Sequence, residues 1–367
     1  MKLFNILFLA VRRSEFDFLE YRHTIDSRVY ESMSKSFEVT HLKLTEPGFT
    51  PLNKTNELFF EGRAGFFYFP IKLCEYVRKE KPAVILVHGF MFPVQLLILQ
   101  LFMPKTTKII IQHHAEKPFI NKVKRLFQKM AYSKADAYLF SSKELADVFS
   151  EGAIIKNKNK VFEVMEGSTL FLKKDKTEAR KLLNIPDTLI FLWVGRLDSN
   201  KDPLTVIKAL HKFKESGNEF KLYMIYATNE LEQEIKNYID TNHLQTHINL
   251  LGKVPHPELE DWYNAADYFI AGSHYEGSGI ALCEAMACGC IPVATAIPSF
   301  LKMTDNGQLG FLFEPENTND LLHKLSQLHT INPEDLSTKV VLHFNKELSL
   351  QAIGKKIERI ANSLLQK

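Results

Sequence analysis

Short runs of β-branched and aromatic residues alternate with longer amphipathic stretches along the whole chain. Several short runs are continuously apolar, which is typical of parallel strands covered on both faces. The strands expected in the first half are Phe4–Val11, Phe37–Leu44, Ala83–His88, Lys108–His113, Ala137–Ser141 and Val161–Met165. Those expected in the second half are Leu189–Gly195, Lys221–Ala227, Ile248–Gly252, Tyr268–Ser273, Ile291–Thr295 and Gly310–Phe313. This alternation of strands and helices predicts an α/β protein built from doubly wound parallel sheets.

The pattern is interrupted between residues 167 and 188, where a polar run follows Gly167. We place a domain boundary there, which gives Rossmann-like domains over residues 1–170 and 171–343. Residues 344–367 are expected to form an amphipathic C-terminal helix that packs back on the first domain. Because doubly wound sheets bind ligands beyond the carboxyl ends of their strands, we expect the two domains to face each other across a ligand-binding cleft.

Composition is that of a globular protein, with 45% hydrophobic and 24% charged residues. The longest apolar run, Phe90–Met103, is shorter than the roughly 20 residues of a membrane-spanning helix and better suits a buried helix. No cleavage site follows the first apolar run. The cysteines form neither a disulfide framework nor a metal-binding pattern, so we interpret them as core residues and expect no metal. They are Cys74, Cys283, Cys288 and Cys290. The sequence therefore predicts a cytoplasmic protein.

The net charge of +3 is unevenly distributed. Residues 1–170 contain 25 Lys and Arg against 18 Asp and Glu, whereas the remainder contains 21 against 25. The basic first half predicts an anionic partner, either a phosphorylated acceptor or the inner face of a membrane. The alternative is a solvated basic face. We expect no nucleic-acid partner.

A glycine-rich turn opens a helix in the second half. Gly277, Ser278 and Gly279 precede the first helical residue, Ile280. Unpaired backbone N–H groups at the positive end of a helix dipole suit an anion, so this turn predicts a diphosphate site.

Two glutamates flank that turn. Glu276 precedes the helix and Glu284 lies inside it, which places their carboxylates about 10–12 Å apart. A retaining glycosidase pair needs about 5–5.5 Å, so these residues do not form one. Their separation suits a sugar nucleotide, because each carboxylate can accept two hydrogen bonds from vicinal hydroxyls of the sugar or the ribose.

Two cations follow the expected strand that ends at Gly195. Arg196 offers a planar fork to phosphate oxygens, and Lys201 offers a point charge. Cleavage of a glycosyl–phosphate bond leaves negative charge on the diphosphate, which fixed cations stabilise without a metal. The alternative is a pair of exposed loop cations.

Three further segments are candidates. The turn at Lys253 and Val254 suits either a nucleobase contact or a plain strand-to-helix connection. His113 and His114 end a first-domain strand, and we favour His114 as the side chain that enters the cleft. Glu166, Ser168 and Thr169 lie near the domain boundary and are further cleft candidates.

The Glu276–Glu284 spacing, with Gly277 and Gly279 between, resembles the Glu–x7–Glu signature of family 4 glycosyltransferases, which carry a group 1 glycosyltransferase domain. The segments after Gly195 and around Lys253 are similar to that family's phosphate and base sites. Two departures stand out. Asp202 replaces the family's usual glycine after the lysine, and the loop from Ala10 to Phe16, with Arg12 and Arg13, lacks the usual Gly-Gly pair.

The resemblance implies a GT-B fold and a retaining, metal-independent transfer of a hexosyl group from a nucleoside diphosphate sugar, with UDP favoured, to an acceptor hydroxyl. Glu276 would orient the sugar and Glu284 would bind the ribose. Arg196 and Lys201 would neutralise the leaving diphosphate, while backbone groups at Ser278, Gly279 and Ile280 would hold sugar and phosphate.

The acceptor is expected to be a polysaccharide or a lipid-linked glycan, received by the first domain through His114 and the helix around Lys122–Lys134. The alternative function is a catalytically silent sugar-nucleotide or glycan-binding partner of another glycosyltransferase. The sequence offers no context for the pyridoxal-binding lysine of a phosphorylase.

Overall fold

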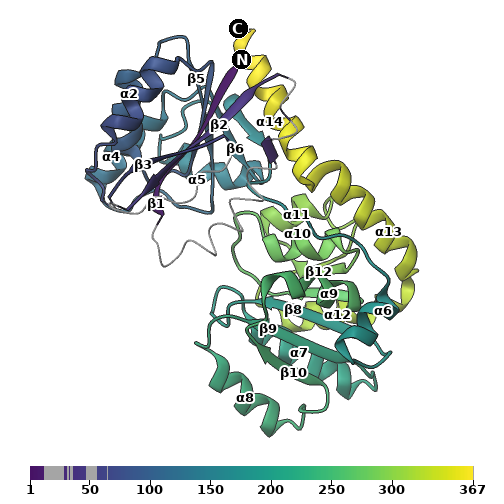
Figure 1. The fold of residues 1–367 in the computed structure, drawn as a ribbon. Helices are drawn as coiled ribbons and strands as arrows, with labels where there is room; N and C mark the ends of the chain where they lie inside the picture. The colour runs from purple at the N-terminus through teal and green to yellow at the C-terminus, as the bar shows by residue number, and fades with distance from the viewer. Residues whose placement is uncertain (12–28, 31–32, 34–35, 47–55, 64, 367) are drawn as a thin grey trace. The chain divides into compact units, whose positions relative to one another are not determined.

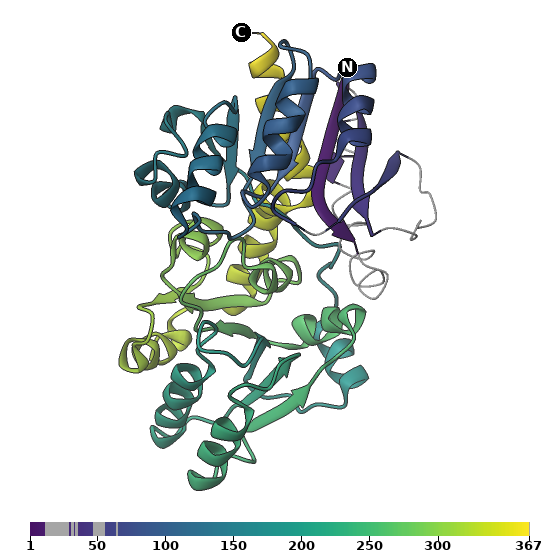
Figure 2. The same ribbon diagram turned by 90° about the vertical axis from the view of Figure 1, so that its left-hand side faces the viewer.

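The computed structural model of the chain describes residues 1–11, 29–30, 33, 36–46, 56–63 and 65–366. It contains two compact units, which are shown in Figures 1 and 2. The first unit comprises residues 1–168 and 350–367, and the second comprises residues 169–349.

The first unit is built on a seven-stranded parallel sheet in the order β3-β2-β1-β4-β5-β6-β7. Its strands are β1 (Lys2–Val11), β2 (Glu38–Thr45), β3 (Glu57–Glu61), β4 (Val84–His88), β5 (Lys108–Gln112), β6 (Ala137–Phe140) and β7 (Val161–Glu163). All six strands expected in this half are present. The additional strand β3 lies at the sheet edge and has a glutamate at each end, so its apolar run is too short to stand out in the sequence.

Helices cover both faces of this sheet. In Figure 1, α2 (Ile71–Glu80) and α4 (Lys122–Tyr132) lie on one side and α14 (Leu350–Leu365) lies on the other. Between α2 and α4 packs α3 (Pro93–Phe102), the helix expected in the apolar run Phe90–Met103. Shorter elements complete the unit: α5 (Asp147–Glu151) and the 3₁₀ turns η2 (Lys143–Ala146) and η3 (Lys158–Lys160).

The second unit has a six-stranded parallel sheet in the order β10-β9-β8-β11-β12-β13. Its strands are β8 (Ile190–Gly195), β9 (Lys221–Tyr226), β10 (Ile248–Gly252), β11 (Tyr268–Ala271), β12 (Ile291–Thr295) and β13 (Phe311–Phe313). Each corresponds to an expected strand.

Side-chain alternation along β11 shows how helices cover both faces of this sheet. Tyr268 and Ile270 join a buried cluster with residues of α7 (Pro203–Glu215) and α12 (Thr318–Ser326), whereas Phe269 contacts Tyr263 of α9 (Leu259–Ala265). The remaining elements are α6 (Lys176–Leu183), α8 (Glu232–Thr241), α10 (Ile280–Ala287), α11 (Pro298–Met303), α13 (Pro333–His343), η4 (His256–Glu258) and η5 (Leu328–Thr330).

The C-terminal segment differs from the expectation of one helix beginning at residue 344. After α13 the chain makes a π turn, η6 (Phe344–Leu348), and α14 begins only after Ser349 adopts an extended backbone with ψ 156°. Phe344 and Leu348 are buried in the second unit, while the later apolar residues belong to the first. The second unit ends at Ser349, whereas the expected helix began at residue 344. The apolar positions step by five residues from Leu348 to Ile353, across this break, and by three or four elsewhere in the segment.

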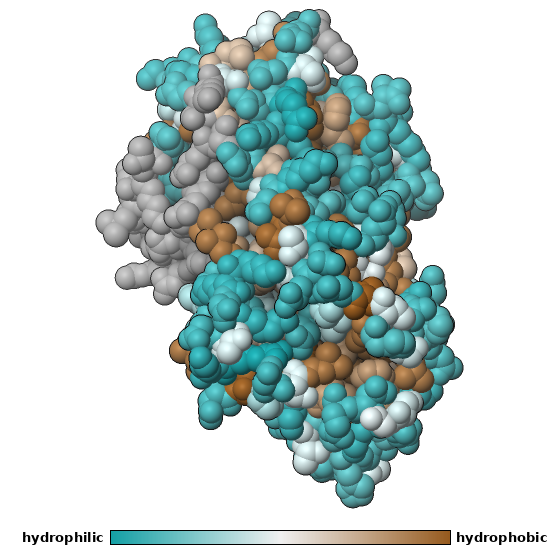
Figure 3. Space-filling view, turned by 90° about the vertical axis from the view of Figure 1, so that its right-hand side faces the viewer, coloured by the Kyte–Doolittle hydropathy of each residue, from teal (hydrophilic) through white to brown (hydrophobic). Residues whose placement is uncertain are grey.

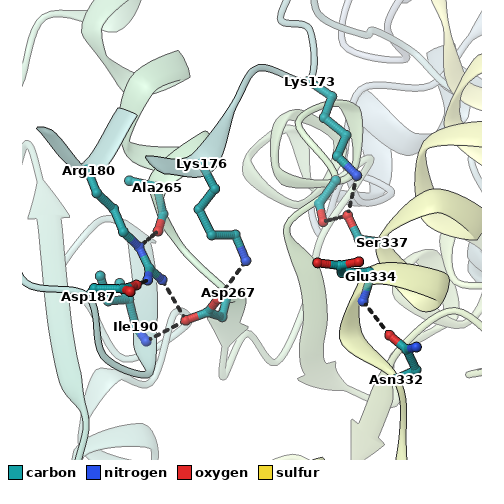
Figure 4. A network of polar contacts seen from close by, with 11 residues as sticks. Lys173, Lys176, Arg180, Asp187, Ile190, Ala265, Asp267, Asn332, Glu334 and Ser337 are labelled. Atoms are coloured by element: carbon teal, nitrogen blue, oxygen red, sulfur yellow. Dashed lines mark hydrogen bonds and ion pairs between the residues drawn. The ribbon is translucent and has the colours of Figure 1, made fainter. Parts of the chain in front are cut away.

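The first boundary lies at 168/169, close to the expected 170/171. Polar contacts hold the chain to the second unit directly after it, as Figure 4 shows. Lys173 donates to Ser337 (3.0 Å), and Lys176 pairs with Asp267 (2.6 Å). The buried Arg180 bonds the same Asp267 at 2.8 Å, so one carboxylate, directly before β11, holds two residues of α6 against the sheet.

The surface face in Figure 3 is mainly hydrophilic, with smaller hydrophobic areas between. Among the helices of the described residues, none has the length and apolar character needed to cross a bilayer. All four cysteines are buried and free, and burial raises the pKa of the Cys74 thiol to about 12.

Candidate functional site

Adjacent strand ends bring Lys201 and Glu276 together in the second unit. Lys201 follows β8 and Glu276 follows β11, and these two parallel strands are paired. Their side chains form an ion pair in which the ammonium group donates to Oε1 of the carboxylate. Both side chains are largely withdrawn from solvent, so their charges are less screened than those of an exposed pair.

Hydrogen bonds between the two loops fix this arrangement. The amide of Asn200 donates to the carbonyl of Tyr275 (3.1 Å), and the backbone N–H of His274 donates to the carbonyl of Asn200 (2.8 Å). Gly272 allows the close approach, because a Cβ there would lie 2.7 Å from the carbonyl oxygen of Asp202. Asn200 and His274 lie within the two segments singled out in the sequence, next to Lys201 and Glu276, but the sequence assigned neither of them a role.

The conformation and contacts of Asp202 explain how an aspartate can stand where the family pattern has a glycine. Its backbone is left-handed, with φ 40°, a conformation that glycine adopts most readily. Its carboxylate caps α7 by accepting from the N–H of Thr205 (3.2 Å) and lies 3.1 Å from Nε2 of His274. The aspartate therefore keeps the backbone conformation associated with glycine and adds two polar contacts.

The second predicted cation occupies a different environment. The Arg196 side chain is 59% exposed, and its Nε lies 3.0 Å from Oδ2 of Asp198. Of the two cations, the structure brings Lys201 to Glu276 and leaves Arg196 on a neighbouring acid of its own loop.

The start of α10 depends on Gly279. This residue is the N-cap, with φ +64°, and an added Cβ would lie 2.5 Å from Cε1 of Phe300. Ser278 before it is buried, and the helix continues with Ile280. Glycine is therefore required here both for the left-handed backbone and for space, and the turn leads from Glu276 directly to the first N–H groups of α10.

Glu284 is buried within α10 at 3% exposure, and both of its oxygens have partners. Oε1 lies 2.7 Å from Nε2 of His256, and Oε2 accepts from the hydroxyl of Tyr263 at 3.0 Å. Burial, reinforced by the nearby carboxylate, raises the pKa of Tyr263 well above its ordinary value, so the tyrosine remains a neutral donor.

His256 also connects Glu284 to the turn predicted to meet a nucleobase. Lys253 in that turn is exposed and Val254 is half-buried. The ring of His256 also packs against that of Phe171, with 5.0 Å between the ring centroids. His256 and Tyr263 follow the turn at Lys253 and Val254 in the sequence, but no spacing rule indicated that both would bind Glu284.

In the first unit, His114 lies just beyond β5 and is contacted at both ring nitrogens. Its Nε2 lies 2.7 Å from Nδ1 of His88 at the end of β4, and its Nδ1 lies 3.3 Å from Oε2 of Glu166. Nε2 of His88 lies 2.6 Å from the amide oxygen of Asn5 in β1. An amide oxygen only accepts, so a neutral His88 donates there and receives its other hydrogen bond from His114.

His113 has a different setting. It is buried, stacks on Phe140 with 4.5 Å between ring centroids, and lies 2.9 Å through Nε2 from the carbonyl oxygen of Glu116. Burial lowers its pKa to about 4, so the ring is neutral near pH 7 and belongs to the core. Of the two adjacent histidines, His114 is the one at the strand end with a partly exposed side chain.

Ser168 and Thr169 are both buried at the boundary between the units, and the Thr169 hydroxyl accepts from the N–H of Phe171 (3.1 Å). The Glu116 carboxylate accepts from the N–H of His114 (2.7 Å), and burial raises its pKa. Arg12 and Arg13 lie outside the described residues.

Residues 175–339, all within the second unit, match the family model of glycosyl transferases group 1. The match is to this segment, which is less than half of the chain. The matched segment contains Lys201, Glu276 and Glu284 together with the loops that position them. Its boundaries leave the first unit unmatched, in keeping with the weaker sequence resemblance there.

Curated relatives extend the comparison. The uncharacterized glycosyltransferase MJ1178 of Methanocaldococcus jannaschii is 28% identical over 212 residues, covering 58% of this chain and 54% of its own. The amylovoran biosynthesis glycosyltransferase AmsK of Erwinia amylovora is 29% identical over 186 residues, covering 47% and 45%. The chain thus spans about half the length of these relatives.

The whole chain matches solved structures in fold. The structure of HepE from Anabaena in complex with UDP superposes with a TM-score of 0.73 at 14% identity, covering 99% of this chain and 100% of that one. The matched segment and the first unit together therefore form the GT-B fold, with two Rossmann-like domains.

Proposed function

We propose that the chain is a retaining glycosyltransferase that moves a hexosyl group from a nucleoside diphosphate sugar to an acceptor hydroxyl. The observation that carries the proposal is the Lys201–Glu276 pair, held between two strand ends and followed directly by the Gly279 start of α10. This order suits a sugar diphosphate: the cation and the backbone N–H groups can bind phosphate oxygens, and the carboxylate can accept hydrogen bonds from the sugar.

Each group has a distinct task in this proposal. The N–H groups at the start of α10 and the ammonium of Lys201 bind the diphosphate, and Glu276 exchanges its contact with Lys201 for the sugar hydroxyls. Glu284, oriented by His256 and Tyr263, accepts hydrogen bonds from the ribose. Arg196 reaches the diphosphate after leaving Asp198, which its exposed position allows.

The transfer breaks the bond between the anomeric carbon and the phosphate oxygen, and the electron pair remains on the diphosphate. The acceptor oxygen bonds to the same carbon from the same face, and its proton passes to the departing phosphate oxygen. Fixed positive charge on the diphosphate stabilises this leaving group, so no metal is needed for that step.

UDP is the proposed nucleotide, in line with the UDP complex of HepE, and a polysaccharide or lipid-linked glycan is the proposed acceptor, in line with the named role of AmsK. The first unit, with His114 between His88 and Glu166, receives the acceptor. The same proposal places the chain in the cytoplasm.

The test measures UDP release from a panel of UDP-sugars, with and without candidate acceptors, for the unaltered chain and for Glu276→Ala. Removing the carboxylate should reduce release at least about 100-fold, since it loses contacts to the reacting sugar. The matched control is Glu232→Ala, which removes a lysine-paired carboxylate from α8 of the same unit and should leave release unchanged. Equal rates for all three proteins would contradict the proposal.

One observation favours a second candidate, a catalytically silent sugar-nucleotide-binding partner of another glycosyltransferase. Arg196 is paired with Asp198 and exposed instead of meeting Lys201 and Glu276. Calorimetry combined with the release assay separates the two functions. Both a silent partner and an enzyme bind UDP with an affinity that Lys201→Ala weakens. Only the enzyme also releases UDP from a sugar-nucleotide donor.

A further inference from the structure

Helix α4 in the first unit buries one side and exposes apolar residues on the other. Gln128, Ala131 and Tyr132 face the core. On the other side, Val123 is 61% exposed, Leu126 55% and Met130 50%, and Ile120 just before the helix is 92% exposed. At about 100° per residue, Val123, Leu126 and Met130 fall within an arc of about 60°. We call these three residues the α4 stripe.

Basic residues border the α4 stripe on one side. On the same helical projection, Lys122 and Lys129 lie beside the stripe, whereas Lys124 projects about 100° away on the other side, beyond Phe127 and near the direction of the buried Ala131. The surrounding sequence from residue 117 to residue 134 contains six Lys or Arg and no Asp or Glu. The Lys124 ammonium lies 5.3 Å from the ring centroid of Phe66 and 5.7 Å from that of Phe119, so cation–π contacts position it.

The helix is held in place from its core side. The Asn121 side chain caps it by accepting from the N–H groups of Val123 (3.0 Å) and Lys124 (3.1 Å). The buried amide of Gln128 donates to the carbonyl of Phe90 and accepts from the N–H of Phe119, both at 2.9 Å. The stripe is thus presented on an anchored helix, and its exposure does not depend on a helix forming upon binding.

The neighbouring helix α3 extends the same kind of surface. Leu101 on α3 is 82% exposed, and the Gln100 amide on that helix donates to the carbonyl of Ala131 in α4 at 2.8 Å. Figure 2 shows helices α2 to α4, in blue, in front of the first unit's sheet. The buried helix expected in Phe90–Met103 is thus present as α3, with Leu101 exposed in its last turn.

We propose that the α4 stripe inserts into the surface of an anionic lipid bilayer, with the flanking lysines on the lipid headgroups. A helix with exposed apolar residues on one side and cations beside them matches the requirements of the water–lipid interface. Anionic lipid is the occupant that the charge favours. A second copy of the chain would instead bring two lysine-rich surfaces together without an acid to neutralise them.

Membrane docking does not require the proposed transferase activity. If both proposals hold, the hexosyl group is transferred to its acceptor at a membrane surface. The experiment is flotation of the full chain, without substrate, on vesicles of phosphatidylcholine alone and of phosphatidylcholine with about 30% phosphatidylglycerol. Binding should require the anionic lipid and weaken as salt is raised, because screening shortens the range of the charges.

Two sets of variants test the two parts of the surface. Lys122→Glu with Lys129→Glu should weaken partitioning at least about 25-fold, since each basic residue contributes about fivefold at an anionic surface. Val123→Ser with Leu126→Ser should also abolish flotation. The matched control is Leu182→Ser with Leu342→Ser, which changes two exposed leucines of the second unit and should float as the unaltered chain does.

The proposal is overturned if the chain fails to float on anionic vesicles, or if the control pair reduces flotation as much as the stripe pair. It is also overturned if the unaltered chain is a dimer by light scattering and Leu126→Ser is a monomer, which would make the stripe a contact between copies. UDP release measured on the same variants in solution separates loss of docking from loss of the transferase.

Discussion

Glu284 binds ribose, in our proposal, only if its carboxylate keeps one orientation, and two side chains provide that orientation. His256 and Tyr263 each contact one oxygen of the buried group. A carboxylate inside a helix has few ways to turn, so losing either partner changes both its direction and its solvation. His256 is thus a positioning residue that acts on the nucleotide through Glu284.

Replacing His256 by alanine should weaken UDP binding about tenfold, because a hydrogen bond to a charged group is worth roughly 1.5–3 kcal/mol and part of it is replaced by water. Titration calorimetry with UDP measures this. His211→Ala is the control, since His211 also contacts a tyrosine hydroxyl, that of Tyr238, but on the α7–α8 side of the unit. Equal weakening by both changes would show that His256 acts on general stability alone.

His113 gives the first unit a predictable response to acid. Its pKa of about 4 lies below the usual 6.5, so between these values the unfolded chain binds a proton that the folded chain does not. Folding stability therefore falls as the pH is lowered from 6.5 towards 4. His41, with a pKa of about 3, acts in the same direction, whereas the raised pKa of Glu116 opposes both.

The variant His113→Gln keeps a donor for the Glu116 carbonyl and removes the titration. Between pH 7 and pH 5 the unaltered chain should lose roughly 2 kcal/mol more stability than the variant. Urea unfolding followed by near-ultraviolet circular dichroism at both pH values measures the difference. The same pH slope for the two proteins would mean that folding does not lower the pKa of His113.

At the scale of the elements, the start of α10 is the most constrained feature of the candidate site. Gly279→Ala would introduce a side chain into a left-handed backbone and against Phe300. Gly217→Ala is a matched control, because Gly217 has φ +85° but nothing within 4 Å of its added Cβ. The control isolates the backbone cost of about 1 kcal/mol, and the difference between the variants reports the displacement of Phe300.

We expect Gly279→Ala to lower stability by about 1–3 kcal/mol more than Gly217→Ala, and to lose UDP binding that Gly217→Ala retains. Thermal unfolding with and without UDP measures both effects. Retained UDP binding in Gly279→Ala would place the nucleotide away from this turn.

The elements were predictable from the sequence where a buried apolar run marked them, as in the six strands of the second unit. Two features were not. Strand β3 is a short edge strand with charged ends. The break at Ser349 falls within a single five-residue step of the apolar positions, and apolar spacing does not record which unit a residue packs against. The motif residues Lys201, Glu276 and Glu284 were visible in the sequence, whereas Asn200, His256 and His274 act through contacts between loops that only the fold brings together.

At the scale of the whole molecule, the two units differ in how the chain builds them. The second unit is one continuous segment, residues 169–349, whereas the first needs both 1–168 and 350–367. Helix α14 buries one side of its surface, including Ile353, Ile357 and Ala361, and contacts β5 of the first sheet. Without α14, that side of the sheet would expose apolar residues to water.

A fragment of residues 169–349 should therefore unfold cooperatively on its own and bind UDP. A fragment of residues 1–168 should bind an apolar dye such as anilinonaphthalene sulfonate, and joining residues 350–367 to it through a flexible linker should remove that binding. Circular dichroism and dye fluorescence measure these properties. Cooperative unfolding of 1–168 without dye binding would show that α14 is dispensable for its core.

Because the first unit is built from two separate segments of the chain, its first segment must wait for its second during protein synthesis. Its first 168 residues leave the ribosome well before α14, and the whole second unit is made in between. At about 5–20 residues per second this interval lasts roughly 10–40 s, long compared with the folding of a small domain. The nascent first half must therefore persist with one side of its sheet uncovered, which makes it a natural client for a chaperone until translation ends.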